Sequence, residues 1–194
     1  MPEQEAPQPA APEAERVPGI EPAFAALAER FGDELVAARK TADGPDFTVA
    51  PARLADFVAA LRESVLAEPH LFVDACGVER ETALEVVYRF SLVSRREIVT
   101  VRAHMPKDKP AVASLAVMYP GARWPEREYA EMFGITVTGH PDMRHLLLPE
   151  GWVGHPLRKD YVYPLDHPYL APDPLREDPV RVLGHAPEGE GEES

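Results

Sequence analysis

The chain has 194 residues, of which 33 are acidic and 20 are basic, so its formal net charge is −13. One compact domain is expected at this length. The acidic balance argues against nucleic acid as a partner, because phosphate binding needs a face rich in Lys and Arg. The single cysteine, Cys76, excludes an internal disulfide and cannot supply the set of thiolates that an iron–sulfur cluster usually needs.

Hydropathy predicts no membrane-spanning segment. The longest apolar runs, such as residues 111–118, are far shorter than the roughly 18 residues of a transmembrane helix. The first residues lack the basic start and apolar centre of a secretory signal, so we expect a protein of a reducing compartment. Cys76 lies in an apolar stretch and is expected to be an inert thiol in the core.

Both ends of the chain are acidic and rich in proline. Residues 1–19 hold four glutamates and one arginine, and residues 171–194 hold seven acidic residues and two arginines. Such segments cannot bury enough apolar surface to offset the entropy of ordering, so we predict that both are disordered tails.

In the first part of the body the sequence predicts two helices with a weak hairpin between them. Helical spacing of apolar residues indicates a helix over residues 24–31. A weak strand at 34–40 is followed by a turn sequence at 43–45 and a partner strand at 47–49. A stronger helix, opened by proline, covers residues 51–65 with its apolar residues on one face.

Three stronger strands are predicted next. Residues 71–76 are a short apolar run, and residues 84–92 alternate apolar and polar side chains, which is typical of a half-buried strand. The β-branched run at 98–103 is expected to pair with the second of these as an antiparallel hairpin.

Two short helices complete the predicted body, at residues 111–119 and 125–134. Pro125 suits a first helical position, and Gly134 suits a helix end. The order of elements predicts an α+β domain over residues 20–134, with a largely antiparallel sheet and helices on one face.

Residues 135–170, called the strip below, do not have the pattern of a domain core. They are rich in proline and hold four of the seven histidines, and an irregular stretch of this length is uncommon in a compact domain unless it serves a function. Its large apolar side chains are too many to leave in water: Met143, Leu146, Leu147, Leu148, Trp152, Leu157, Tyr161, Tyr163 and Tyr169. We expect the strip to pack partly on its own domain and partly on a partner. Packing wholly on its own sheet is the alternative.

The histidines of the strip allow two interpretations. Imidazole is a common metal ligand, and His140, His145, His155 and His167 lie within one segment. Their spacing is irregular, however, and three of the four precede proline, which favours extended backbone. We therefore expect hydrogen-bonded structural histidines and no metal site.

The acidic run at residues 126–131 could supply paired carboxylates for acid–base chemistry. On a helix, Glu126 and Glu128 would lie in the first turn, where negative charge is favourable, and Arg127 and Glu131 could pair across one turn. We expect a helix-end and interface charge network here. The sequence also shows no glycine-rich nucleotide loop and no nucleophile elbow.

Longer motifs carry a family resemblance. The run from Glu126 to Ile135, the run from Gly139 to Leu147 and the run from Gly154 to Tyr161 resemble the C-type subunit of NADH-quinone oxidoreductase, respiratory complex I, as do residues 73–78 and 85–88. The resemblance covers about residues 71–165. Its interface and motif positions are Glu126, Arg127, Glu128, Glu131, Phe133, Gly134, His140, Pro141, Asp142, Arg144, Trp152, Gly154, His155, Pro156, Arg158, Lys159, Asp160 and Tyr161.

The resemblance implies a structural subunit of the peripheral arm, with no catalytic residue, metal or cofactor of its own. It implies docking on the large quinone-site subunit of the D type and on other peripheral-arm subunits, at the cytoplasmic side of a bacterial inner membrane. The complex would use FMN, iron–sulfur clusters, NADH and quinone, and would translocate protons. Two alternatives stay open: the equivalent subunit of a related membrane-bound hydrogenase, and a stand-alone metal-dependent enzyme that uses the clustered histidines.

Overall fold

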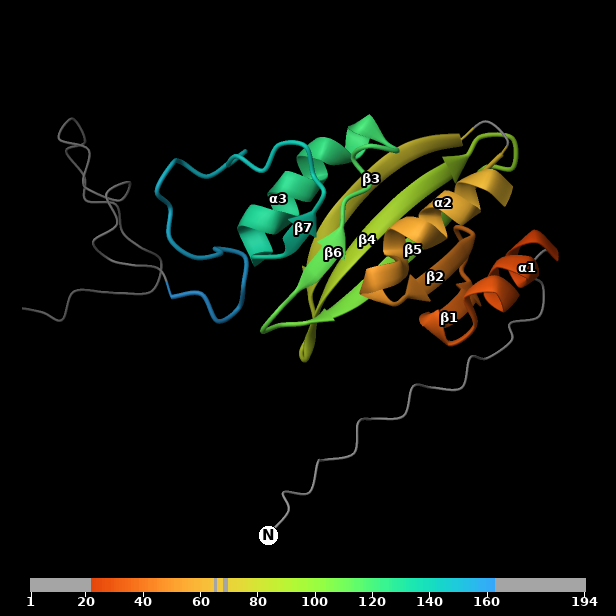
Figure 1. Cartoon of the computed structure of the whole chain (residues 1–194), viewed down its shortest axis with the longest axis horizontal. Coiled ribbons are helices and arrows are strands. Elements are labelled where there is room, and N and C mark those ends of the chain that lie inside the picture. Colours follow the sequence, from red (N-terminus) through yellow and green to blue (C-terminus); the bar gives the residue numbers. More distant parts are fainter. Residues whose placement is uncertain (1–21, 65, 68–69, 163–194) are drawn as a thin grey trace, which may run out of the picture. The chain divides into compact units, whose positions relative to one another are not determined.

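The structure, a computed structural model, describes residues 22–64, 66–67 and 70–162 (Figure 1). The predicted tails at 1–19 and 171–194 lie outside these residues, as do His167, Tyr163 and Tyr169 of the strip. The helices and strands are α1 (Pro22–Phe31), β1 (Leu35–Lys40), β2 (Pro45–Val49), α2 (Leu54–Ser64), β3 (His70–Glu79), β4 (Ala83–Leu92), β5 (Glu97–Pro106), β6 (Ala111–Ala113), α3 (Arg123–Phe133) and β7 (Thr136–Thr138). Single turns of 3₁₀ helix precede β1, α2 and α3.

Five strands form the main sheet in the order β1-β2-β5-β4-β3. All neighbours are antiparallel except β2 and β5, which run parallel and are separated in the chain by α2, β3 and β4. The alternating run predicted at 84–92 is β4, at the centre of the β3-β4-β5 meander. The predicted α+β class with a largely antiparallel sheet is confirmed.

The core lies on one face of this sheet, under all three helices. Tyr88 of β4, Val101 of β5 and Phe47 of β2 are register partners and share this face. Phe47 packs on Phe57 of α2, while the Tyr88 hydroxyl lies 2.7 Å from that of Tyr129 in α3. All of these side chains are buried, so the helices lie on one face as predicted.

A close approach between β3 and α3 depends on Gly77. A Cβ at this position would lie 2.7 Å from the Phe133 ring and 2.9 Å from Tyr129 Cβ. The glycine therefore lets α3 pack directly against the strand, which makes α3 a fixed part of the domain.

The predicted helix at 111–119 is wrong. Residues 111–113 form β6, which pairs in parallel with β7, and Val112 is buried against the core. The next residues are held by a side chain instead of by helical bonds, because the amide of Leu115 donates to the carboxylate of Glu126. Helix α3 also begins earlier than expected, at Arg123, and ends before Gly134 as predicted.

The expected burial of Cys76 is also wrong, since its side chain is exposed. Ala75 faces the core, so Cys76, the next residue of β3, points to the opposite face of the sheet. Partial burial, together with the nearby carboxylates of Asp74 and Glu85, raises the pKa of this thiol. It is therefore protonated at neutral pH although it is accessible.

Among the described residues, no helix is long and apolar enough to cross a membrane.

Candidate functional site

The part of the strip that follows β7, residues 139–161, runs beside α3 and is joined to it by a series of side-chain-to-backbone bonds (Figure 1). Three charged residues of the family motifs, Arg127, Glu131 and Arg158, take part in these bonds. The contacts form three groups, at the middle of α3, at its C-terminal end and at the end of β3.

At the middle of α3, Arg127 and Glu131 hold the strip backbone between them. Arg127 donates from Nε to the carbonyl of residue 144 (2.8 Å) and from a terminal nitrogen to that of His145 (2.7 Å). The Glu131 carboxylate accepts from the amides of Leu146 (2.9 Å) and Leu147 (2.7 Å). The expected ion pair between Arg127 and Glu131 is therefore wrong, because both side chains bond to the strip instead.

At the C-terminal end of α3, the strip caps the helix. The last carbonyls of a helix lack intrahelical partners. Three of them accept bonds from the strip: Glu131 O from His155 Nδ1 (2.9 Å), Met132 O from the Leu157 amide (3.1 Å) and Phe133 O from Arg158 Nε (2.7 Å). The cation of Arg158 also complements the negative end of the helix dipole, so the motif at residues 154–158 acts as a helix cap.

Gly134 makes this cap possible. Its φ of 72° is left-handed, and its amide closes the helix on the Ala130 carbonyl at 2.9 Å. A Cβ at this position would overlap the imidazole of His155. Glycine is therefore required both by the backbone conformation and by the packing of the cap.

A third contact joins the strip to the end of β3. The Glu79 carboxylate accepts from Lys107 Nζ (2.6 Å) and from the amide of Lys159 (2.7 Å). The hydrogen bond from Lys107 holds the pKa of Glu79 below its usual range. Arg158 reinforces this contact through a bond to the Lys107 carbonyl at 3.0 Å.

The turn at residues 140–144 has its own polar contacts. The His140 side chain is buried; its Nε2 donates to the carbonyl of Arg123 (3.1 Å), and its Nδ1 accepts from the amide of Asp142 (3.0 Å). Arg144 makes a two-pronged ion pair with Asp142, and this hydrogen bonding holds the pKa of that carboxyl far below its usual range. His140 and His155 are thus hydrogen-bonded structural histidines, as expected.

Glu126 attaches α3 to the sheet. Its carboxylate is fully buried and accepts from the Tyr88 hydroxyl (3.1 Å), the Leu115 amide (2.7 Å) and the hydroxyl of Ser114. It lies in the first turn of α3, as predicted, where the helix dipole also favours an anion. These three donors hold the buried carboxylate in place, so Glu126 is a structural residue at this interface.

The tyrosines around Glu126 make the fold sensitive to alkali. Burial raises the pKa of Tyr88 and of Tyr129 well above 10, the ordinary tyrosine value. Stability is therefore complete below pH 10 and falls above it, since the unfolded chain then loses protons first. We expect the free energy of unfolding to fall by about 1.4 kcal/mol per pH unit for each tyrosine. Urea titrations from pH 8 to 11 test this, and Tyr129→Phe should remove the contribution of one tyrosine to the slope. An unchanged slope would contradict the assignment.

Large apolar side chains are exposed on α3 and the strip. Of those exposed in the described residues, most lie here or on the loop before α3: Val117, Trp124, Met143, Leu147, Val153 and Leu157. The indole of Trp124 is 70% exposed, and with Leu146 and Leu147 it lines a hollow at the start of α3. The strip therefore does not bury all of its apolar surface on its own domain, which is the pattern of a protein interface.

The structure brings most of the predicted motif residues together. Those with bonds inside the chain are Glu126, Arg127, Glu131, Phe133, Gly134, His140, Asp142, Arg144, Trp152, His155, Arg158, Lys159 and Tyr161. Glu128, Pro141, Gly154 and Asp160 are exposed, and Pro156 is half-buried. The sequence did not indicate which residues bond to the motif residues, above all Tyr88 and Ser114 at Glu126, and Glu79 and Lys107 near residues 158–159.

The fold and these contacts define a class of protein: an α+β domain with a strip that is fixed by side-chain-to-backbone bonds and presents apolar side chains. Comparison with known proteins identifies the family. Residues 47–167, more than half of the chain, match the family model described as "Respiratory-chain NADH dehydrogenase, 30 Kd subunit". The chain belongs to this family, and the prediction from the motifs is confirmed.

Three relatives show the extent of the similarity. The C-type subunit of NADH-quinone oxidoreductase from Thiobacillus denitrificans is 36% identical over 73% of this chain and 76% of its own length. The C-type subunit from Roseiflexus castenholzii is 40% identical over 58% of the chain and 66% of its own length. The C/D-type subunit from Methylococcus capsulatus is 34% identical over 92% of the chain. The chain spans only 32% of that last protein.

Proposed function

We propose that this chain is a non-catalytic structural subunit of the peripheral arm of a proton-translocating NADH-quinone oxidoreductase. In this proposal it docks on the large quinone-site subunit of the D type and supports electron transfer from NADH to quinone. The chain holds no cofactor; FMN, iron–sulfur clusters, NADH and quinone belong to the rest of the complex. The complex lies at the inner membrane, with this subunit on the cytoplasmic side.

The proposal rests on the contacts that the charged motif residues make. Arg127 and Glu131 direct their charges to the strip backbone, and Arg158 of the strip bonds to the last carbonyl of α3. Together these contacts fix the strip's conformation before any partner binds. The exposed face then carries Trp124, Leu147 and further apolar residues. A preorganised apolar surface binds with little ordering cost. The relative whose name joins the C and D types supports a D-type partner for this surface.

The partner is tested by purifying the tagged chain from gently solubilised membranes and identifying the large subunit that comes with it. A D-type quinone-site subunit is the expected result. A nickel-bearing large subunit in its place would favour the hydrogenase alternative, and recovery of the chain alone would contradict both.

Two exposed motif residues test the strip separately from the fold. The Arg144 side chain is 85% exposed and Asp160 is exposed, so Arg144→Ala and Asp160→Ala should leave the melting temperature of the isolated chain nearly unchanged. We expect both to reduce the amount of assembled complex and its quinone reductase activity. Arg53→Ala on the helix side, also an exposed arginine, is the control. Normal assembly and full activity of both strip variants would show that the assigned interface role is wrong.

A further inference from the structure

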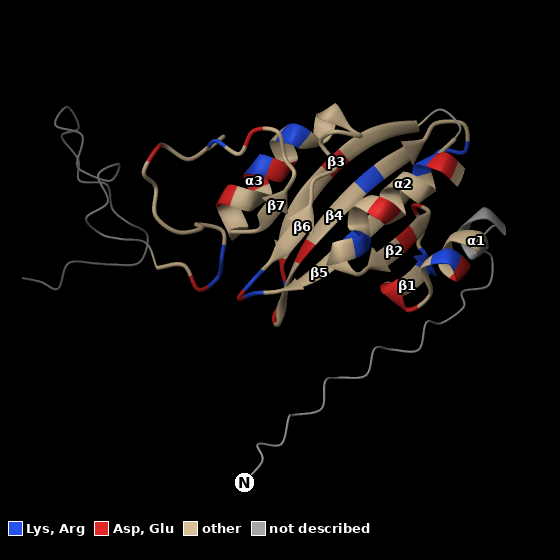
Figure 2. Ribbon diagram, viewed as in Figure 1, with Lys and Arg blue, Asp and Glu red and all other residues tan. Residues whose placement is uncertain are grey.

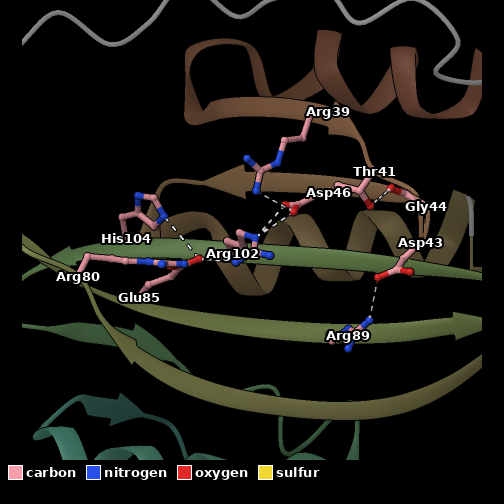
Figure 3. Close-up of polar contacts among 10 residues, drawn as sticks. All are labelled: Arg39, Thr41, Asp43, Gly44, Asp46, Arg80, Glu85, Arg89, Arg102 and His104. Atoms are coloured by element: carbon pink, nitrogen blue, oxygen red, sulfur yellow. Dashed lines mark hydrogen bonds and ion pairs between the residues drawn. The ribbon is translucent and has the colours of Figure 1, made fainter.

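The face of the sheet opposite the helices carries a second polar cluster, unrelated to the strip. Acidic and basic residues lie on the strands as well as on α3 (Figure 2). Arg102 of β5 pairs in register with Val87 of β4 and Thr48 of β2. These residues alternate with the core-facing ones, so their side chains point away from the helices. No described helix covers this face, on which the clustered side chains lie in Figure 3.

Five residues on this face form what we call the charge ladder, in which positive and negative side chains alternate across the strands. The ion pairs are Arg39 to Asp46 (3.0 Å), Arg102 to both oxygens of Asp46 (3.0 Å each), Arg102 to Glu85 (2.7 Å) and Arg80 to Glu85 (2.6 Å) (Figure 3). Each carboxylate is thus held between two guanidinium groups.

In the ladder the two carboxylates are buried and the two outer arginines are exposed. The side chains of Glu85 and Asp46 are only 1% and 4% exposed, whereas those of Arg39 and Arg80 are 60% and 55% exposed. His104, half exposed, lies 3.7 Å from Glu85. A partner that approaches the ladder therefore meets guanidinium and imidazole groups, while its two carboxylates lie out of reach beneath them. Elsewhere on this side of the sheet, Asp43 and Asp74 are exposed.

The exposed guanidinium groups of Arg39 and Arg80 can donate further hydrogen bonds to a partner. In the described structure Arg80 contacts Glu85 through Nε, and Arg39 contacts Asp46 through one terminal nitrogen. A guanidinium carries five N–H donors in a fork that fits a carboxylate. Three arginines that share two carboxylates do not make the Lys- and Arg-rich face that a nucleic acid needs. The chemistry that fits is a short polypeptide segment with Asp or Glu side chains.

We propose that the charge ladder is a docking surface for an acidic segment of a second polypeptide, whose carboxylates pair with the exposed edges of Arg39 and Arg80. This surface lies on the face of the sheet opposite the helices. The proposal is therefore independent of the strip and of the proposed function.

Cys76 provides the place for a direct test. It is the only cysteine of the chain, it is exposed on this face, and its register partner Val87 pairs in turn with Arg102. Replacing Cys76 in the full chain by the photoreactive residue p-benzoylphenylalanine, in cells that assemble the complex, allows crosslinking in place.

We expect the probe at position 76 to crosslink to a peptide of another chain that is rich in Asp and Glu. Crosslinks only within this chain, its acidic ends included, or to a segment without an acidic excess would overturn the proposal. The same probe at Arg144 tests the strip, so the two proposals fail separately.

Charge-neutral variants complete the test. With Arg39→Gln and Arg80→Gln together, the crosslink from position 76 should fall several-fold and should become less sensitive to added salt. Arg53→Gln, a comparably exposed arginine that pairs with Glu34 on another element, is the matched control and should leave the yield unchanged. An unchanged yield in a double variant that keeps the wild-type melting temperature would overturn the proposal.

Discussion

Replacing Arg102 by methionine should lower the free energy of unfolding by about 3 kcal/mol, the lower end of the range for breaking a buried ion pair. The guanidinium, 22% exposed, is shared by two buried carboxylates on neighbouring strands. Burial alone would raise the pKa of Glu85, but the bonds from Arg102 and Arg80 hold it below the usual value. Without Arg102, Glu85 and Asp46 each keep only one outer arginine. Urea unfolding of the isolated chain measures the loss.

Two comparisons make this prediction specific. Arg53→Met removes an exposed arginine that pairs with Glu34 and Asp56, and it should cost less than about 1 kcal/mol. Adding Glu85→Gln and Asp46→Asn to the Arg102 variant removes the charges left buried and should recover part of the loss. Equal destabilisation by the Arg102 and Arg53 variants would contradict the role given to the ladder.

Glu131→Ala should release the strip from the middle of α3. It leaves the amides of Leu146 and Leu147 without their carboxylate partner, and losing hydrogen bonds to a charged group costs about 1.5–3 kcal/mol each. We expect hydrogen exchange at these two amides to accelerate by at least about tenfold, since 1.4 kcal/mol corresponds to that factor in the opening equilibrium. Assembly into the complex should fall with it.

Glu128 is the matched control for Glu131. It has the same side chain on the same helix but is exposed, so Glu128→Ala should change neither the exchange of the strip amides nor the melting temperature. If the Glu131 and Glu128 variants exchanged alike, the strip would not depend on the observed contact.

The sequence predicted the fold where local patterns and tertiary structure agree. The strict alternation at 84–92 identified β4, and the glycine at 134 correctly marked the end of α3. The predicted helix at 111–119 was wrong because residues far away in the sequence set the conformation there. Strand β6 pairs with β7, and the amide of Leu115 bonds to the carboxylate of Glu126. The Cys76 prediction failed because β3 carries apolar residues on both faces, so its pattern cannot say which face is covered.

The candidate site was predictable in its residues but not in its contacts. The motif positions were recognisable, yet the spacing of Arg127 and Glu131 suggested a pair within the helix. Their true partners are backbone groups of the strip, 15–18 residues further along the chain. Backbone acceptors and donors are the same at every residue, so no side-chain pattern can reveal them. The ladder was missed for a related reason, since Asp46, Glu85 and Arg102 come together only through the strand order.

We expect a partner to cover the exposed apolar side chains of α3 and the strip. Hydroxyl-radical footprinting of the isolated chain and of the assembled complex measures this at Trp124, Leu147 and Leu157, all exposed in the single chain. Oxidation of these side chains should slow strongly on assembly. Equal oxidation rates in the two states would contradict it.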